Sequence, residues 1–268
     1  MSIGVDTSNE IAANPLLSEY TKEDFSKVMT NGYDTLVEFS IKNSFIGYKT
    51  LDTSNEKHSA PFRYTTFSIY TANNHKIAFV LNRNGEILIF KSGNLLFAKR
   101  RGGWRLFTYN SVLRQLAFGS RKLEKKLIES IYESILDVSF ARTGACIGII
   151  KKTKEKNFLD DKKITPEDRL SENRSTKTAV ILKALDNKKF QDTDRRLRQE
   201  ILGIDGAVVL SSKGDFITAG AILHLNAGSE GGARLAAAKT LSVYGISIKV
   251  SADGEIKVFS QDRSFTFG

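Results

Sequence analysis

The sequence contains few of the residues that mark several common classes of protein. Its 268 residues include one cysteine, Cys146, three histidines and three prolines. A single cysteine cannot form an internal disulfide, and it excludes a zinc site built from several cysteines. The histidines, His58, His75 and His224, are far apart in the chain, so the sequence gives no indication of a structural metal site.

Long apolar segments are also missing. No run approaches the roughly 18 residues that a membrane-spanning helix needs. The first 20 residues lack a basic region followed by an apolar core, so we expect no secretory signal. The hydrophobic fraction of 41% and the charged fraction of 26% are typical of a globular protein. We therefore expect a cytoplasmic protein with no contact to a membrane.

Positive charge is in excess. The chain carries 40 Lys and Arg against 30 Asp and Glu, a net charge of +10, with a pI near 9.5. This excess suits a polyanionic partner such as a nucleotide or a nucleic acid, and it is equally typical of a basic, solvated surface. The basic residues occur in short groups, at 99–101, 151–152 and 195–198.

The N-terminal part is predicted to contain an antiparallel β-meander over residues 63–107. Residues 1–12 have the composition of a flexible polar lead, Thr21 has the position of a helix cap, and the polar residues 47–62 indicate a loop. Four strand-like runs follow, at 63–71, 75–82, 85–91 and 94–100. Asn84-Gly85 between two apolar runs is a strong hairpin signal.

After residue 109 the hydrophobic period changes from two to about 3.6, which indicates helices over 109–118 and 120–141. We expect a buried strand at 144–150, a polar surface excursion at 151–174 and mainly helical residues at 175–201. The last third alternates, with strands expected at 205–211, 216–223, 246–251, 255–260 and 264–267.

The chain is thus predicted to have two domains, 1–115 and 116–268. The first is a helix followed by the β-meander, and it offers a surface for a protein partner. The second has an α/β (α+β) fold with a mixed sheet wrapped by helices.

One stretch of the second domain has the composition of an anion site. The segment "NAGSEGGARLAAAKTLS" places Gly231 and Gly232 before an alanine-rich helix that carries Arg234 near its start. Glycines allow close approach of the backbone, and the first N–H groups and the dipole of a helix favour an anion. Arg234 adds a guanidinium suited to phosphate oxygens. A glycine-rich connection to a packed alanine helix explains the same pattern equally well.

A second feature favours a phosphate ligand. Asp205, Gly206 and Ala207 open the strand that precedes this segment. A carboxylate at a strand end, upstream of a phosphate-binding loop, suits a divalent cation with a polyphosphate. Asp-Gly is also a common turn pair.

Together these motifs resemble the diadenylate cyclase domain, the family known from the DNA-integrity scanning protein. The similar segments are "ARTGACIGII", "IDGAVVLSSKGDFITAGAIL" and "GGARLAAAKTLS", and they cover about residues 120–260. The family pattern ends in Gly-Thr-Arg-His-Arg-Ala-Ala, with a serine four residues on. Here Gly232, Ala233 and Arg234 stand at its first three positions, and Ala237, Ala238 and Ser242 complete the match.

The resemblance implies roles for these residues. In the family the aspartate, here Asp205, binds a catalytic Mg²⁺ or Mn²⁺ and helps to activate the ribose 3′-hydroxyl, while the Arg-His-Arg motif holds the phosphates. Two ATP-loaded protomers then meet face to face, so a homo-oligomer is implied. This chain has Leu235 and Ala236 in place of the histidine and the second arginine. Each lost hydrogen bond from a charged group is worth about 1.5–3 kcal/mol.

Three functions remain open. The first is a catalytically degenerate sensor that binds ATP or a cyclic dinucleotide through Asp205, Gly206, Ala207 and residues 231–234. The second is an active diadenylate cyclase that makes cyclic di-AMP, in which Lys239 or the arginines Arg195, Arg196 and Arg198 replace the missing phosphate contacts. The third is a basic module that binds nucleic acid or another protein through its charged surface.

Overall fold

The computed structural model describes residues 1–10, 12, 15–52, 60–73, 75–101, 103–107, 123–224, 232–261 and 263–267. The helix expected over 109–118 lies outside these residues. The chain divides into two compact units, Met1–Tyr109 and Asn110–Gly268. Each unit has its own sheet with accompanying helices, so the expected α+β class is confirmed. In the described ranges, no helix combines the length and the apolar character needed to cross a membrane.

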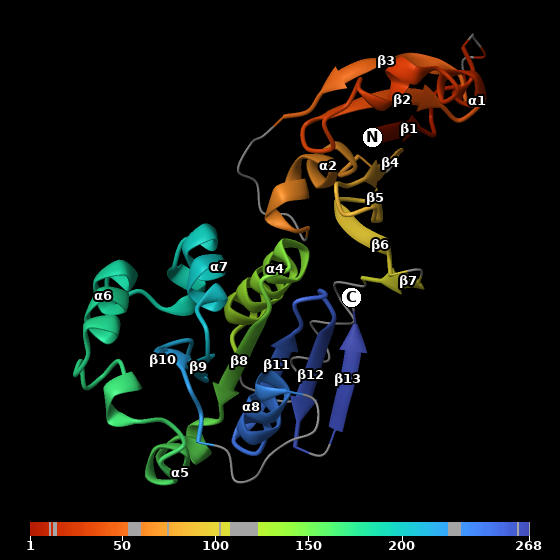
Figure 1. Ribbon diagram of the computed structural model, residues 1–268. Helices are drawn as coiled ribbons and strands as arrows, with labels where there is room; N and C mark the ends of the chain where they lie inside the picture. The colour runs from red at the N-terminus through yellow and green to blue at the C-terminus, as the bar shows by residue number, and fades with distance from the viewer. Residues whose placement is uncertain are drawn as a thin grey trace. The chain divides into compact units, whose positions relative to one another are not determined.

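The N-terminal unit is built on a seven-stranded sheet with the order β3-β2-β1-β4-β5-β6-β7 (Figure 1). The strands are β1 Ser2–Asp6, β2 Thr35–Ser40, β3 Phe45–Thr50, β4 Lys76–Leu81, β5 Ile87–Lys91, β6 Asn94–Arg100 and β7 Gly103–Leu106. β1 pairs in parallel with β2, and the other pairs are antiparallel. The predicted β4–β5 and β5–β6 hairpins are therefore confirmed. The strand β7 was not predicted and extends the meander by one hairpin.

The expected flexible lead is wrong, because β1 lies in the middle of this sheet, between β2 and β4. Ser2 and Gly4 are buried although neither is apolar. A Cβ atom on Gly4 would stand within 3 Å of the Tyr70 ring. The glycine thus makes room for an aromatic ring over a central strand, which hydropathy alone does not reveal.

The strand expected over 63–71 is also wrong. These residues form a 3₁₀ turn, η2 Phe62–Tyr64, followed by the helix α2 Thr65–Tyr70. The side chain of Phe67 is fully buried, and its ring stacks on Phe90 of β5 with centroids 5.8 Å apart. The helix α2 packs on β4 and β5 and covers the apolar face that includes Leu88 and Phe90.

The helix start and the loop predicted between residues 17 and 62 are also wrong in position. Thr21 does not start a helix; it caps the C-terminal end of the short helix α1 Leu17–Tyr20, and η1 Asp24–Lys27 follows. The loop expected at 47–62 begins inside β3. Tyr20 is buried in a small aromatic cluster with Phe39 and Phe45, which fixes α1 against β2 and β3.

The C-terminal unit contains a six-stranded mixed sheet with the order β10-β9-β8-β11-β12-β13. The strands are β8 Ala145–Ile150, β9 Ala207–Ser211, β10 Phe216–Ala221, β11 Gly245–Val250, β12 Ile256–Ser260 and β13 Arg263–Phe267. β8 and β9 run parallel, and the remaining neighbours are antiparallel. All five strands predicted for the last third are present, and so is the strand over 144–150.

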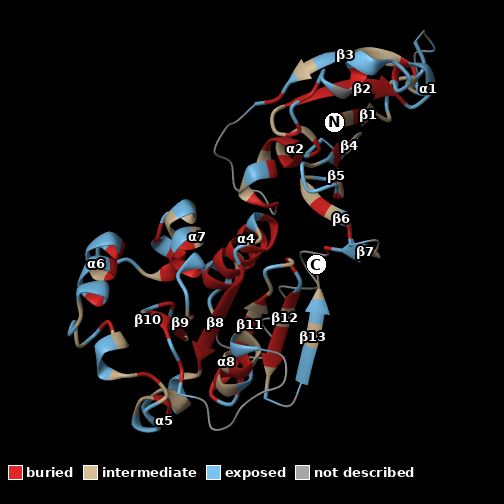
Figure 2. Ribbon diagram, in the orientation of Figure 1, coloured by how far each residue is buried: buried red, intermediate tan, exposed pale blue. Residues whose placement is uncertain are grey.

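The helices of this unit are α4 Lys125–Ala141, α5 Glu155–Asp160, α6 Thr176–Leu185, α7 Arg195–Gly203 and α8 Ala233–Ser242. Of these, α4, α7 and α8 pack on the sheet, in agreement with the predicted sheet wrapped by helices. α4 is buried along most of its length (Figure 2) and packs against α7 and β11. α8 lies on β8 and β11.

The polar segment 151–174 is more ordered than a surface excursion. It contains α5 and the turns η3 Lys152–Lys154 and η4 Pro166–Asp168. Phe158, Ile164 and Leu170 are each at most 3% exposed. Three apolar side chains are therefore enough to anchor an otherwise polar stretch to the core.

Candidate functional site

The predicted anion site begins at the first turn of α8. Gly232 is the N-cap, with φ at +87°, and no side chain caps the helix. The N–H groups of Leu235 and Ala236 donate to the Gly232 carbonyl. Within the described residues, no acceptor is found for the N–H groups of Ala233 and Arg234. These two amides and the positive end of the helix dipole favour an anion. Gly231 lies outside the described residues.

Arg234 lies against the start of β8. A Cβ atom at Gly144 would be 2.7 Å from Nη1 of Arg234 and 3.3 Å from the backbone nitrogen of Ala252. Gly144 has a φ of +73°, so glycine is needed both for the backbone conformation and for the space that the guanidinium fills. No ion pair to Arg234 is present in the part of the chain that the structure describes.

The positive charge of Arg234 affects the pKa of Cys146 in the neighbouring core. Burial raises the pKa of the Cys146 thiol to about 12, and the positive charge of Arg234 acts against this shift. Cys146 is 2% exposed and belongs to the apolar core of the sheet. The thiol therefore stays protonated at neutral pH and acts as a packing group.

Asp205 lies just before β9 and is exposed. Its Oδ1 accepts a hydrogen bond from the N–H of Gly206 at 3.0 Å. The structure records no ion pair to this carboxylate from the residues it describes. Ala207 is different, because its side chain is 2% exposed and packs in the core. Its side chain therefore contributes to the packing of the sheet, and its predicted role in ligand binding stays a prediction.

The sheet register brings Asp205 and Arg234 to the same edge. β8 and β9 are parallel, with Cys146 opposite Ala207. Extending this register by two residues places Asp205 opposite Gly144, on which the Arg234 guanidinium rests. Asp205 and the guanidinium of Arg234 thus lie at the same edge of the sheet. No ion pair between them is recorded in the described residues.

Two glycines shape the backbone beside Asp205. Gly206 has a φ of +107°, and a Cβ atom there would be 2.6 Å from the carbonyl carbon of Gly220 on β10. Gly220 has a φ of +68°, and a Cβ atom there would be 2.5 Å from Cγ2 of Ile204 and 3.1 Å from the Asp205 carbonyl oxygen. Lys177 of α6 donates to the Gly220 carbonyl at 2.9 Å and also to Asp168. The backbone at the mouth of β9 is thereby held in one conformation.

The residues at the two altered motif positions face the core. Leu235 packs against the apolar cluster of the sheet, and Ala236 is 5% exposed. A longer polar side chain at position 236 would have to displace packed neighbours. Ser242, which completes the motif, is at the other end of α8 and donates to the Lys239 carbonyl.

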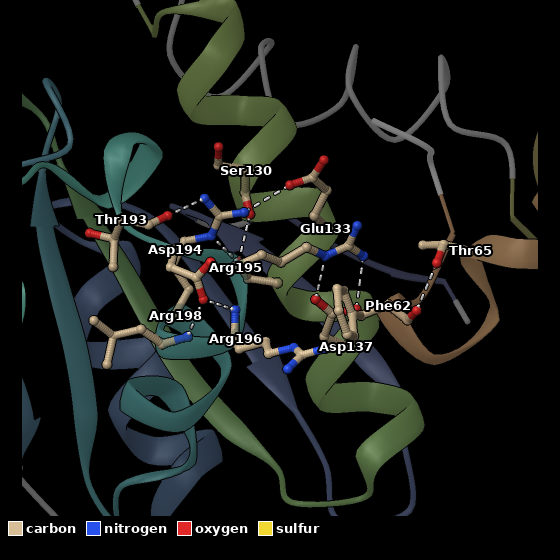
Figure 3. Close-up of polar contacts among 12 residues, drawn as sticks. Phe62, Thr65, Ser130, Glu133, Asp137, Thr193, Asp194, Arg195, Arg196 and Arg198 are labelled. Atoms are coloured by element: carbon tan, nitrogen blue, oxygen red, sulfur yellow. Dashed lines mark hydrogen bonds and ion pairs between the residues drawn. The ribbon is translucent and has the colours of Figure 1, made fainter. Parts of the chain in front are cut away.

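The expected replacement of the missing phosphate contacts by Arg195 and Arg198 is wrong. Arg195 donates to both oxygens of Asp137 on α4, and Arg198 donates to Glu133 on the same helix (Figure 3). Arg198 also donates to the Ser134 hydroxyl and to the Thr193 carbonyl. These guanidiniums hold α7 on α4. Lys239 is exposed and lies five residues after Arg234, which is about 7.5 Å farther along the helix axis.

The described residues do not form a complete protein site for a divalent cation. Among them no group of three His, Cys, Asp or Glu side chains is placed to hold a metal ion. Asp205 offers one exposed carboxylate before β9, and Mg²⁺ sites usually use one or two carboxylates together with substrate phosphates.

Sequence reasoning missed Gly144, Gly220 and Lys177. The Thr-Gly pair at the end of "ARTG" marks the stop of α4 and could have indicated a special backbone position there. The contact of Lys177 with Gly220 joins residues 43 positions apart, and no local pattern predicts it.

The chain has only low similarity to known proteins and structures. No family model and no curated protein matches the chain. A Bacillus cereus structure described as a hypothetical membrane spanning protein is 20% identical, with a TM-score of 0.41, and covers 59% of this chain and 71% of its own. A double mutant of DacA from Staphylococcus aureus is 18% identical, with a TM-score of 0.37, and covers 54% of this chain and 87% of its own. At these values the similarity carries no functional argument.

Proposed function

We propose that the C-terminal unit binds a nucleotide, either ATP or a cyclic dinucleotide, and acts as a sensor that does not synthesise it. The observation that carries this proposal is the placement of Arg234. Its guanidinium rests on Gly144, has no carboxylate partner in the described residues, and lies beside the uncapped start of α8. A phosphate at this point would receive hydrogen bonds from two backbone amides and one guanidinium.

Asp205 supplies the other half of the proposed site. Its carboxylate is exposed at the same edge of the sheet and is an acceptor only. A ribose hydroxyl or a base amino group carries the complementary donor. The nucleotide would therefore be oriented with its phosphate at α8 and its donor groups at the mouth of β9.

The small number of side chains available to bind phosphate supports a sensor and not a synthase. Leu235 and Ala236 pack in the core, and Arg195 and Arg198 are held by carboxylates of α4. The transition state of a nucleotidyl transfer needs charge stabilisation beyond that of the bound ground state. With Arg234 as the remaining arginine of the motif, we infer ligand binding without appreciable turnover.

Calorimetric titration with ATP and with cyclic di-AMP tests the binding. We expect saturable binding of one of these ligands, weakened on the order of 10- to 100-fold by Arg234→Ala, because a hydrogen bond from a charged group is worth about 1.5–3 kcal/mol. Arg263→Ala is the matched control, since Arg263 is exposed on β13. Equal affinities of the wild type and Arg234→Ala for both ligands would reject the assignment.

A separate assay decides between sensor and enzyme. Incubation of the full chain with ATP and Mn²⁺ should leave ATP unchanged. Accumulation of a cyclic dinucleotide that is abolished by Asp205→Asn would instead establish the cyclase, which the exposed carboxylate of Asp205 favours. Salt-dependent binding to DNA, with no binding of either nucleotide, would support the basic interaction module.

A further inference from the structure

The N-terminal unit contains a pocket of about 390 Å³ around Tyr33. Four segments line it: Met1 at the start of the chain, the residues that lead into β2, the turn η2, and the β4–β5 hairpin. This volume lies within the range of about 300–1,000 Å³ that is usual for small-molecule sites. The pocket belongs entirely to this unit.

Two arginines from different segments converge in this pocket. The Cζ atom of Arg63 lies 5.1 Å from the centre of the Tyr33 ring, and that of Arg83 lies 5.5 Å from the same centre. Arg63 comes from η2 and Arg83 from the β4–β5 hairpin. Contact with one ring thus brings two like charges together, although each arginine is exposed.

No carboxylate neutralises this pair in the described part of the chain. Neither arginine forms an ion pair there, and no acidic side chain is among the residues that line the pocket. The acidic groups nearby are already engaged. Glu86 accepts from Arg100 at 2.6 Å and from Asn82 at 2.7 Å, and Asp34 accepts from Asn31.

The segments that carry Tyr33 and Arg83 are held by side-chain amides. The Asn31 oxygen accepts from the N–H groups of Tyr33 and Asp34, at 2.9 and 3.1 Å. The Asn82 oxygen accepts from the N–H groups of Asn84 and Glu86, both at 2.9 Å. The walls are therefore fixed before a ligand arrives, which lowers the entropic cost of binding.

We infer that this pocket binds a small organic anion through a carboxylate or phosphate group placed between Arg63 and Arg83. Both groups match the planar donor geometry of guanidinium, and an anion would relieve the repulsion between the two cations. The inference goes beyond the proposed nucleotide site, because it concerns the other unit of the chain.

Titration of the full chain at low salt with citrate, inorganic phosphate and pyrophosphate tests this inference and separates carboxylate from phosphate ligands. The variants Arg63→Gln and Arg83→Gln remove one charge each at exposed positions. We expect saturable binding of at least one probe, weakened on the order of 10-fold or more in both variants. Arg105→Gln, at an exposed arginine of β7, is the matched control and should bind as the wild type does.

Arg234→Ala distinguishes this site from the proposed nucleotide site. A probe that binds at Tyr33 should lose no affinity in this variant, whereas a probe that binds at α8 should. Thermal unfolding and circular dichroism of each variant establish that the fold is retained. Absence of saturable binding for all three probes, or equal binding by the wild type, Arg63→Gln and Arg83→Gln, would overturn the inference.

Discussion

Asp137 of α4 accepts two hydrogen bonds from the guanidinium of Arg195 of α7, at 2.7 Å from Nε and 2.9 Å from Nη2. The side chain of Asp137 is 1% exposed and that of Arg195 is 16% exposed. Burial lowers the pKa of Arg195, but hydrogen bonding and charge from Asp137 outweigh it, so the net shift is upward. The two charges hold α4 and α7 together in a position from which water is largely excluded.

Asp137→Ala should destabilise the C-terminal unit by about 3–5 kcal/mol, since it leaves a largely buried guanidinium without its carboxylate. Urea unfolding measures this loss. Far-UV circular dichroism follows both units, whereas the fluorescence of Trp104, the one tryptophan of the chain, reports on the N-terminal unit. The loss of stability should therefore appear in the circular dichroism transition and not in the fluorescence of Trp104.

Asp192→Ala is the control for that experiment. Asp192 accepts from Lys126 of the same helix α4, but both side chains are largely exposed. Exposed ion pairs contribute little to stability. If Asp137→Ala and Asp192→Ala lost the same stability, burial would not explain how strongly the Asp137–Arg195 ion pair stabilises the unit.

Gly144→Ala tests the position of Arg234. The new Cβ atom would be 2.7 Å from Nη1 and would force the guanidinium away from β8. We expect the nucleotide affinity to fall on the order of 10-fold, toward that of Arg234→Ala. The positive φ of +73° adds a backbone cost of roughly 1–2 kcal/mol in stability.

Gly85→Ala separates these two effects. Gly85 has the same φ of +73°, and nothing lies within 4 Å of its Cβ position. This variant should show the backbone cost with unchanged nucleotide affinity. A Gly144→Ala protein that bound nucleotide as tightly as the wild type would show that the contact between Arg234 and Gly144 does not position a phosphate ligand.

The errors of prediction in the N-terminal unit have a common physical origin. Residues 63–71 are rich in β-branched and aromatic side chains, which favour strands, yet they form η2 and α2. The buried positions Tyr64, Phe67 and Thr71 follow a helical spacing, and packing of Phe67 on Phe90 outweighs the intrinsic preference. In β1, the position of Gly4 is covered by the ring of Tyr70 from α2, which is distant in the chain.

Prediction was more successful in the C-terminal unit because its signals are local. The strand and helix patterns around Asp205 and Arg234 predicted the elements, and short connections limited where those elements could lie. The parallel pairing of β8 with β9 places Asp205 beside the start of β8, and it depends on contacts about 60 positions apart. The packing of Leu235 in the core likewise depends on strands elsewhere in the sheet, so the residues around Leu235 do not predict it.

The close contact of α8 with β8 gives another prediction. A Cβ atom at Gly148 would be 2.9 Å from Cδ1 of Leu241, which is fully buried. Gly148→Ala should therefore cost about 1–3 kcal/mol of stability through overpacking. Combining it with Leu241→Val, which removes volume at the contact, should give a loss smaller than the sum of the single losses, with a coupling on the order of 1 kcal/mol. Strict additivity in urea unfolding would contradict this contact.

Glu38 of β2 is the centre of a charged network in the N-terminal unit. Its carboxylate is 2% exposed and accepts from Lys49 at 2.5 Å, Lys76 at 3.2 Å and the Tyr70 hydroxyl at 2.6 Å. Burial acts to raise the pKa of Glu38, but these hydrogen bonds and the charge of Lys76 outweigh it and hold the pKa below its ordinary value.

Because the pKa of Glu38 is lower in the folded than in the unfolded chain, its contribution to stability is fully present above about pH 4.3 and disappears as the pH falls through the folded value. Urea unfolding followed by Trp104 fluorescence should therefore show a loss of stability below this pH. Glu38→Gln has no carboxyl group to protonate at this position, so its stability should change less as the pH falls. Glu10→Gln, at a side chain that is 77% exposed, should keep the wild-type profile. Identical acid profiles of Glu38→Gln and the wild type would show that the network does not stabilise the ionised carboxylate.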